Sequence, residues 1–83
     1  MEETMDIHQK KGLELAKIIM KNTNIPQDEA LDLVMWTYYR KISQEVIEFI
    51  EKKLNRGEIV EEIDILDYIN DLITAMEEQQ NQY

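Results

Sequence analysis

Hydrophobic residues recur every three or four positions along most of the chain, which is the spacing of helices packed against a core. Pro26 and Gly57 divide this pattern into three segments, and no run of β-branched residues bounded by turns predicts a strand. The sequence therefore predicts an all-α protein with a short, a long and a short helix in one small domain, residues 1–83.

The first and third helices are expected at about 6–22 and 64–79. Asp6 can cap the first helix while Gln9 reaches back to it, as in a capping box. Gly12 costs that helix about 1 kcal/mol relative to Ala, so we expect either close approach of a neighbouring helix or a kink there. Asp64 is the expected N-cap of the third helix, and residues 80–83 are expected to form a frayed polar tail.

The middle helix is expected to run without interruption from about 27 to 56, with Gly57 as the left-handed residue past its end. Its apolar residues form two adjacent stripes that together span about 200°, well beyond the roughly 100° of an ordinary surface helix. One stripe comprises Leu31, Val34, Met35, Tyr38, Ile42, Val46 and Phe49; the other comprises Trp36, Tyr39, Ile47, Ile50 and Leu54. Such a helix must contact at least two neighbours along its length.

Two architectures satisfy this requirement. Because the flanking helices are much shorter, the sequence favours a homodimer in which the second stripe meets its symmetry mate. The residues expected at that interface are Trp36, Tyr39, Ile47, Ile50 and Leu54. The alternative is a break near Arg40 and Lys41 that gives a compact monomeric four-helix bundle.

Charge is distributed unevenly. The chain carries 18 Asp and Glu against 9 Lys and Arg, for a net charge of −9, and residues 57–83 contain eight of the acidic residues and no basic one. A surface of one sign attracts basic partners and repels nucleic acid. On the first helix Lys10, Lys17 and Lys21 share one side, which could be a solvated face, a contact with the acidic third helix of a partner subunit, or a phosphate contact.

Catalytic side chains are scarce. The chain lacks Cys, and a Ser-His-acid site would need both His8 and Ser43, which no pattern brings together. The acidic N-terminus does not resemble a signal peptide, and no apolar run approaches the length of a membrane span. We therefore expect a cytoplasmic protein that is not an enzyme, with no catalytic residues, cofactor or metal.

Two acidic clusters, D-E-x-x-D at 28–32 and E-x-x-E-E-x-D at 58–64, stack carboxylates at helical spacing. This arrangement resembles the two acidic motifs of all-α nucleoside triphosphate pyrophosphohydrolases, although Asp stands where that family has Glu. The resemblance implies, as an alternative function, Mg²⁺-dependent nucleotide hydrolysis at Glu29, Asp32, Glu61 and Asp64. Acidic residues at helix starts are also expected from the helix dipole alone.

The aromatic cluster at 35–40 could stack nucleic-acid bases, but it lacks a basic groove, so an interface is favoured. The short–long–short layout of a dimer resembles the histone fold, which implies weak nucleic-acid binding as a second alternative. The basic residues of that family are missing from the second half of this chain.

The function that the sequence favours is non-enzymatic binding by an acidic regulator or adaptor. The third helix would dock on a basic protein surface through Asp64, Asp67, Asp71 and Glu78. An inhibitor that imitates the charge of DNA is one form of this hypothesis.

Overall fold

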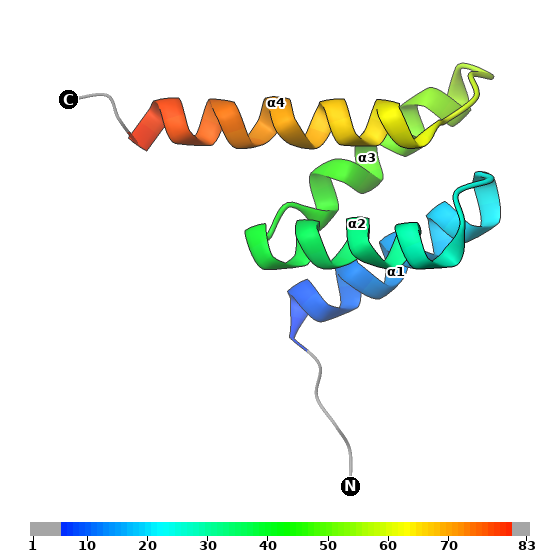
Figure 1. The fold of residues 1–83 in the computed structure, drawn as a ribbon, viewed down its shortest axis with the longest axis horizontal. Coiled ribbons are helices and arrows are strands. Elements are labelled where there is room, and N and C mark those ends of the chain that lie inside the picture. Colours follow the sequence, from blue (N-terminus) through cyan, green and yellow to red (C-terminus); the bar gives the residue numbers. More distant parts are fainter. Residues whose placement is uncertain (1–5, 81–83) are drawn as a thin grey trace, which may run out of the picture.

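The computed structural model describes residues 6–80 of the chain, and within that range it consists of helices and connecting turns without a strand (Figure 1). The all-α prediction is therefore confirmed. The four helices are α1 (Ile7–Asn22), α2 (Gln27–Arg40), α3 (Ser43–Asn55) and α4 (Glu62–Gln80).

The middle segment is not one helix. α2 ends at Arg40 and α3 starts at Ser43, so the prediction of a continuous helix over 27–56 is wrong and the break weighed near Arg40 and Lys41 is present. Lys41 adopts the left-handed conformation, with φ 60°, the one positive φ outside glycine among residues 6–80.

Burial and hydrogen bonding explain the break. The amide of Lys41 donates to the carbonyl of Tyr38, and the amide of Ile42 donates to that of Thr37, which is the bonding pattern of a Schellman motif. The Ile42 side chain is buried, and the hydroxyls of Thr37 and Ser43 lie 3.2 Å apart inside the protein. The turn therefore encloses an apolar side chain and satisfies two buried hydroxyls, which offsets the unfavourable backbone of Lys41.

The other helix ends follow local signals with one exception. Asp6 and Gln9 form the expected capping box, and Gly57 has φ 75° just past α3. α4, however, begins two residues before the predicted Asp64. The Asp64 carboxylate lies inside the first turn and accepts a hydrogen bond from the Glu61 amide at 3.1 Å, so it is not the N-cap. Of the predicted tail, residue 80 closes α4 and residues 81–83 lie outside the described residues.

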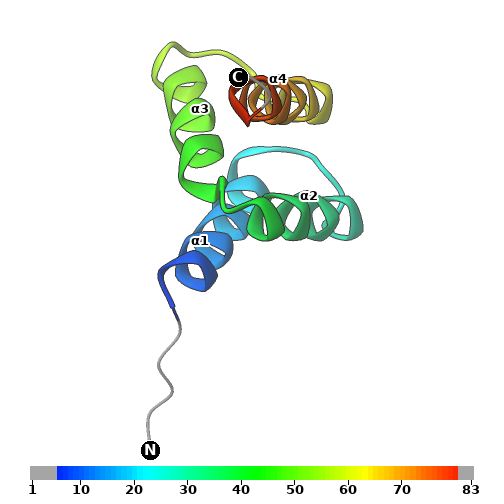
Figure 2. The same cartoon turned by 90° about the vertical axis from the view of Figure 1, so that its left-hand side faces the viewer.

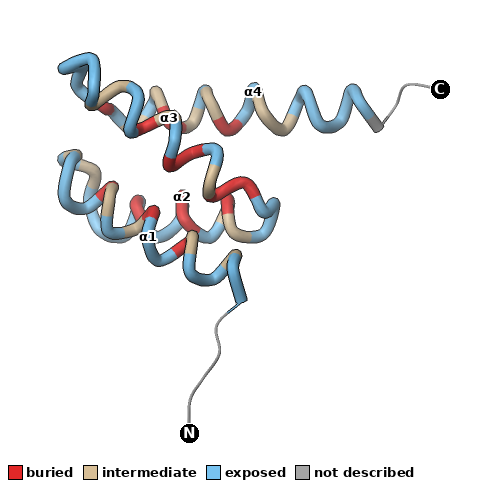
Figure 3. Tube along the Cα trace, turned by 180° about the vertical axis from the view of Figure 1, so that it is seen from behind, coloured by how far each residue is buried: buried red, intermediate tan, exposed pale blue. Residues whose placement is uncertain are grey.

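The helices form a folded-back arrangement. α1 and α2 run side by side in opposite directions, α3 rises from them, and α4 crosses the far end of α3, with α2 and α4 on the same side of α3 (Figures 1 and 2). The core lies where α1, α2 and α3 meet and continues beneath the first half of α4 (Figure 3). Its buried apolar residues are Leu15, Ile19, Ala30, Leu33, Val34, Ile42, Val46, Ile47, Ile50, Val60, Ile65 and Ile69.

α4 is the least enclosed helix. It packs mainly against α3, its second half extends beyond the other helices, and residues 74–79 are exposed (Figure 3). No helix between residues 6 and 80 combines the length and the apolar character that a membrane crossing requires.

Candidate functional site

Three of the four acidic residues predicted on the last helix lie together. Asp64, Asp67 and Asp71 line one side of a shallow hollow of about 240 Å³ between α3 and α4. Glu78 is exposed two turns further along α4 and does not line the hollow. The helical repeat places the three aspartates on one side of α4 because they are three and four residues apart.

The floor of the hollow is aromatic. Phe49 of α3 and Tyr68 of α4 stack with ring centroids 4.3 Å apart and an interplanar angle of 7°. Both side chains are half-buried and both line the hollow. Lys53 lies at one end with its ammonium nitrogen 5.7 Å from the centroid of the Phe49 ring, within cation–π range.

Glutamates of α3 add to the negative charge. The pKa of Tyr68 is raised above its ordinary value, first by burial and then by the negative charges of Glu45 and Glu48. The helical repeat places both glutamates on the side of α3 that carries Phe49. We call the surface formed by Glu45, Glu48, Asp64, Asp67 and Asp71 around Phe49 and Tyr68 the acidic face.

Not every carboxylate of the acidic face is equally free to bind. Asp64 is 4.0 Å from the ammonium of Lys53, which also forms a 3.1 Å ion pair with Glu58, and Asp64 accepts the Glu61 amide as well. Asp64 thus supports the connection between α3 and α4. Asp67 and Asp71 are exposed and are better placed to contact another molecule.

Sequence reasoning missed four members of this surface: Glu45, Glu48, Phe49 and Tyr68. The spacing of Glu45, Glu48 and Phe49 already places them on one side of α3, and Tyr68 follows Asp64 by one turn. What the pattern could not supply was that α3 packs against α4, because the continuous middle helix was expected to meet a second chain.

The predicted dimer interface needs correction. Ile47 and Ile50 are 2% and 0% exposed in the core of a single chain, so they have no surface to offer a second copy. Trp36 and Leu54 are half-buried against the same core. Only Tyr39 of the five predicted residues, at 71% exposed, lies on the surface of the described part of the chain. The turn at Lys41 causes this change, because it redirects α3 so that Ile47 and Ile50 enter the core of the same chain.

The acidic clusters considered for Mg²⁺ are arranged differently from the expectation. Glu29 of α2 faces Glu62 of α4, and the pKa of the Glu62 carboxyl is raised. The largest cause is a hydrogen bond to Glu29, and burial and the negative charge of Glu29 contribute less. Asp64 instead faces Lys53. From residue 6 to residue 80, no group of three or more His, Cys, Asp or Glu is arranged to hold a metal ion, so Glu29, Asp32, Glu61 and Asp64 do not form one.

His8 and Ser43 do come together, contrary to the sequence expectation. Both line a hollow of about 390 Å³ beside Glu45 and Lys41. The Ser43 hydroxyl is buried and lies 3.2 Å from the Thr37 hydroxyl, which itself donates to the Val34 carbonyl. That hydroxyl therefore has its partner inside the protein, and no hydrogen bond joins it to His8 among residues 6–80.

The acidic face has the chemistry of a site for cationic side chains. Carboxylates accept charge-assisted hydrogen bonds from Arg and Lys, and stacked aromatic rings accommodate their apolar stems or their charged groups. The basic residues Lys10, Lys17 and Lys21 are exposed on α1 and belong to a different part of the surface. Comparison of the chain with protein-family models, with curated proteins and with solved structures finds no match.

Proposed function

We propose that this protein acts by binding rather than by catalysis, as an acidic regulator or adaptor whose acidic face docks on a basic protein surface. The observation that carries the proposal is that Asp64, Asp67 and Asp71 line a hollow whose floor is the Phe49–Tyr68 stack. Glu45 and Glu48 lie on the side of α3 that carries Phe49. An aromatic centre with a charged rim is the composition of binding surfaces in which a few residues dominate affinity.

The charge balance of the chain supports a basic partner. The net charge is −9, and residues 57–83 contribute eight acidic residues without a Lys or Arg between them. Interspersed charges of both signs would keep a helix soluble with less self-repulsion. An excess of one sign instead steers a partner of opposite sign toward the surface. A partner that normally holds nucleic acid has this character, and the protein would then act as an inhibitor that imitates the charge of DNA.

The position of α4 also supports the proposal. Its exposed half contributes little to the core, so its surface residues can be selected for binding with little cost to the fold. Asp67 directly precedes Tyr68 and Asp71 follows it by about one helical turn, and all three line the hollow. A Lys or Arg side chain in the hollow could therefore contact a carboxylate and an aromatic ring together.

The test is a pull-down from cells of the source at low salt, using the immobilised wild-type chain and the double variant Asp67→Asn/Asp71→Asn. Both positions are exposed, so the variant is expected to fold normally. We expect basic proteins retained by the wild type to be lost from the variant, and the affinity of a purified partner to fall about tenfold, because exposed ion pairs each contribute up to about 1 kcal/mol.

A matched control separates the acidic face from net charge. The variant Glu14→Gln/Glu51→Gln removes the same two charges at exposed positions elsewhere and is expected to retain the partner. If both double variants release the same proteins to the same extent, binding depends on overall charge alone and the proposal is wrong.

A further inference from the structure

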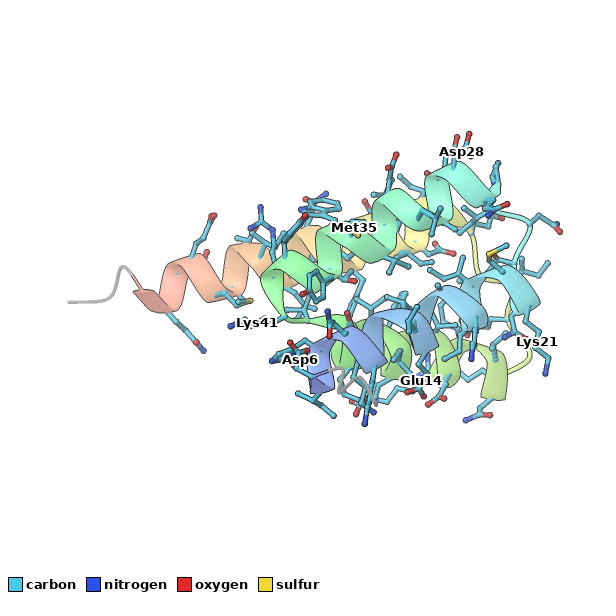
Figure 4. The ribbon with its side chains drawn as sticks, turned by 90° about the horizontal axis from the view of Figure 1, so that it is seen from below. Asp6, Glu14, Lys21, Asp28, Met35 and Lys41 are labelled. Carbon is cyan, nitrogen blue, oxygen red and sulfur yellow. The ribbon has the colours of Figure 1, made fainter. Side chains whose placement is uncertain are left out.

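The outer side of the α1–α2 pair carries an apolar groove remote from the acidic face. Figure 4 views it directly, with α1 and α2 antiparallel and Met35 on the side facing the viewer. The groove has a volume of about 300 Å³ and is lined by Gln9, Gly12, Leu13, Val34, Met35 and Tyr38. Gln9 and the tyrosine hydroxyl are the polar parts of this lining.

Exposed apolar side chains extend the groove along both helices. Leu13 and Met20 of α1 are 51% and 49% exposed, and Leu31 and Met35 of α2 are 46% and 45% exposed. They are spaced at one or two helical turns, so each pair lies along the same side of its helix. Exposed apolar residues in line with an apolar groove indicate a contact surface on a small protein.

Close packing of α1 against α2 does not explain Gly12. A Cβ atom added there would meet only Val34 Cγ1, at an ordinary contact distance of 3.7 Å, so close approach of α2 does not require glycine. The residue still costs the helix about 1 kcal/mol relative to Ala. Gly12 lines the groove, and the lack of a side chain there makes the groove deeper by the volume of a methyl group.

The two edges of the groove carry opposite charges. On α1, the helical repeat places Lys10 and Lys17 just outside Leu13, on the edge away from α2. On α2, it places Asp28 and Asp32 on the edge away from α1, and Figure 4 shows Asp28 there. The outer edge of α1 also carries Glu14, the one acidic residue of that helix, and remains net basic (Figure 4). The strip is therefore apolar along its centre, net basic along one side and acidic along the other.

We propose that a second copy of this chain covers the groove in a two-fold dimer. Rotation by half a turn about an axis parallel to the helices places α1 of one copy over α2 of the other and brings the basic edge against the acidic edge twice. Stacking α1 on α1 would instead oppose like charges, which is costly in an interface. Charge complementarity thus selects one arrangement.

The register of the two helices supports this pairing. Gly12 lies level with Val34, and the helices are antiparallel, so Lys17 lies level with the turn that contains Asp28 and Asp32. Rotation about an axis along the helices keeps each residue at its level. Lys17 of one copy consequently faces the Asp28–Asp32 turn of the other, while Met35 and Leu13 meet at the centre.

This surface is independent of the acidic face. α4 lies on the opposite side of the molecule from the outer side of α1 and α2, so a dimer through the groove leaves both acidic faces exposed (Figures 1 and 4). The dimer also differs from the one expected from the sequence, which used the second stripe of the middle segment. A monomeric chain would contradict the dimer but not binding through the acidic face, and loss of the basic partner would contradict that binding but not the dimer.

The first test measures the mass of the full chain by sedimentation equilibrium across a range of concentrations. We expect a dimer for the wild type and a monomer for Met35→Lys, which places a charge in the centre of the groove. The matched control Ile59→Lys changes an equally apolar exposed residue on the α3–α4 connection and is expected to remain dimeric. Circular dichroism checks that both variants are folded. A monomeric wild type, or a dimer that Met35→Lys leaves intact, overturns the proposal.

The second test mixes two charge variants. Lys10→Asp/Lys17→Asp makes both edges acidic, and Asp28→Lys/Asp32→Lys makes both edges basic. We expect each variant alone to dimerise at least about tenfold more weakly than the wild type and a mixture of the two to regain the wild-type affinity as a heterodimer. Equal affinities for the separate variants and the mixture would show that the edges do not meet, which also overturns the proposal.

Discussion

The α1–α3 unit and α4 differ in how they are held. Three helices and the Lys41 turn enclose most of the core, whereas α4 contributes Ile65 and Ile69 as its fully buried residues within the described range and rests mainly on α3. The charge differs as well: α1 carries four lysines and one glutamate, and α4 carries six acidic residues without a basic one. One region supplies stability, and the other supplies a charged surface.

This division explains how an 83-residue chain can carry a helix whose charged side chains are all acidic. A domain of this size has a small margin of stability, so a helix that repels itself must depend on contacts made elsewhere. The Phe49–Tyr68 stack and the Lys53–Asp64 pair join the two regions at the start of α4. The remainder of α4 is then free to vary.

The largest expected effect breaks the stable region. Ile50→Ala should lower the free energy of unfolding by about 2–5 kcal/mol, because truncating a fully buried side chain leaves a cavity in the core. The matched variant Ile73→Ala, on a half-buried position of α4, should cost only about 1 kcal/mol. Urea titrations of both variants check the comparison, and equal losses would contradict the division between the regions.

A second variant should strengthen the stable region alone. Lys41→Gly relieves the left-handed backbone at the α2–α3 turn and is expected to raise the free energy of unfolding by about 1 kcal/mol. Lys52→Gly in α3 is the control and should lower it by a similar amount, since glycine is unfavourable inside a helix. Both values come from the urea midpoint at unchanged slope. A loss of stability in Lys41→Gly would mean that the lysine side chain matters more than its backbone.

The junction between the regions can be measured by a double-mutant cycle. Phe49→Leu and Tyr68→Leu should show a coupling energy of about 0.5–1.5 kcal/mol, which is the usual contribution of an aromatic pair beyond its buried area. Combining Phe49→Leu with Met76→Leu, further along α4, should give additive effects. Additivity in the first pair would show that the stack does not hold α4 in place.

The smallest expected effect concerns pH. The pKa of the Glu62 carboxyl is raised above 4.5, chiefly by its hydrogen bond to Glu29. The stability that the protonated carboxyl contributes is therefore fully present below pH 4.5, and it is lost as the pH rises through the raised pKa. Thermal unfolding should therefore show that Glu62→Gln is more stable than the wild type at neutral pH. On acidification the wild type should gain more stability than Glu62→Gln, because the glutamine has no proton to take up. The control Glu51→Gln should keep the wild-type dependence. An unchanged pH profile in Glu62→Gln would show that the two carboxylates do not interact.

Local signals made much of the fold predictable. The Asp6–Gln9 capping box, Pro26 and the left-handed Gly57 set helix ends through residues near them in sequence, and the helical spacing of apolar residues indicated an all-α protein. The turn at Lys41 contains neither Gly nor Pro. It exists because Ile42 is buried and because Thr37 and Ser43 pair, and both are tertiary effects that an apolar repeat cannot reveal.

The sequence predicts that the candidate site is acidic, but not which residues of other helices join it. The acidic residues of the last helix stand out in the sequence, and Asp64, Asp67 and Asp71 do lie together. The aromatic centre and the two glutamates of α3 depend on which helices pack together. That pairing follows from the turn at Lys41. The preference for a continuous middle helix over the break near Arg40 and Lys41 therefore accounts both for the missed site residues and for the misplaced interface.

The left-handed turn also fixes the relative direction of two helices. With Lys41 at φ 60°, α3 leaves the end of α2 at an angle, and Ile42 enters the core together with Val46 and Ile50 (Figure 1). Because α4 packs mainly against α3, its position depends on the same turn. Lys41 and Ile42 thus orient the charged last helix relative to the rest of the fold.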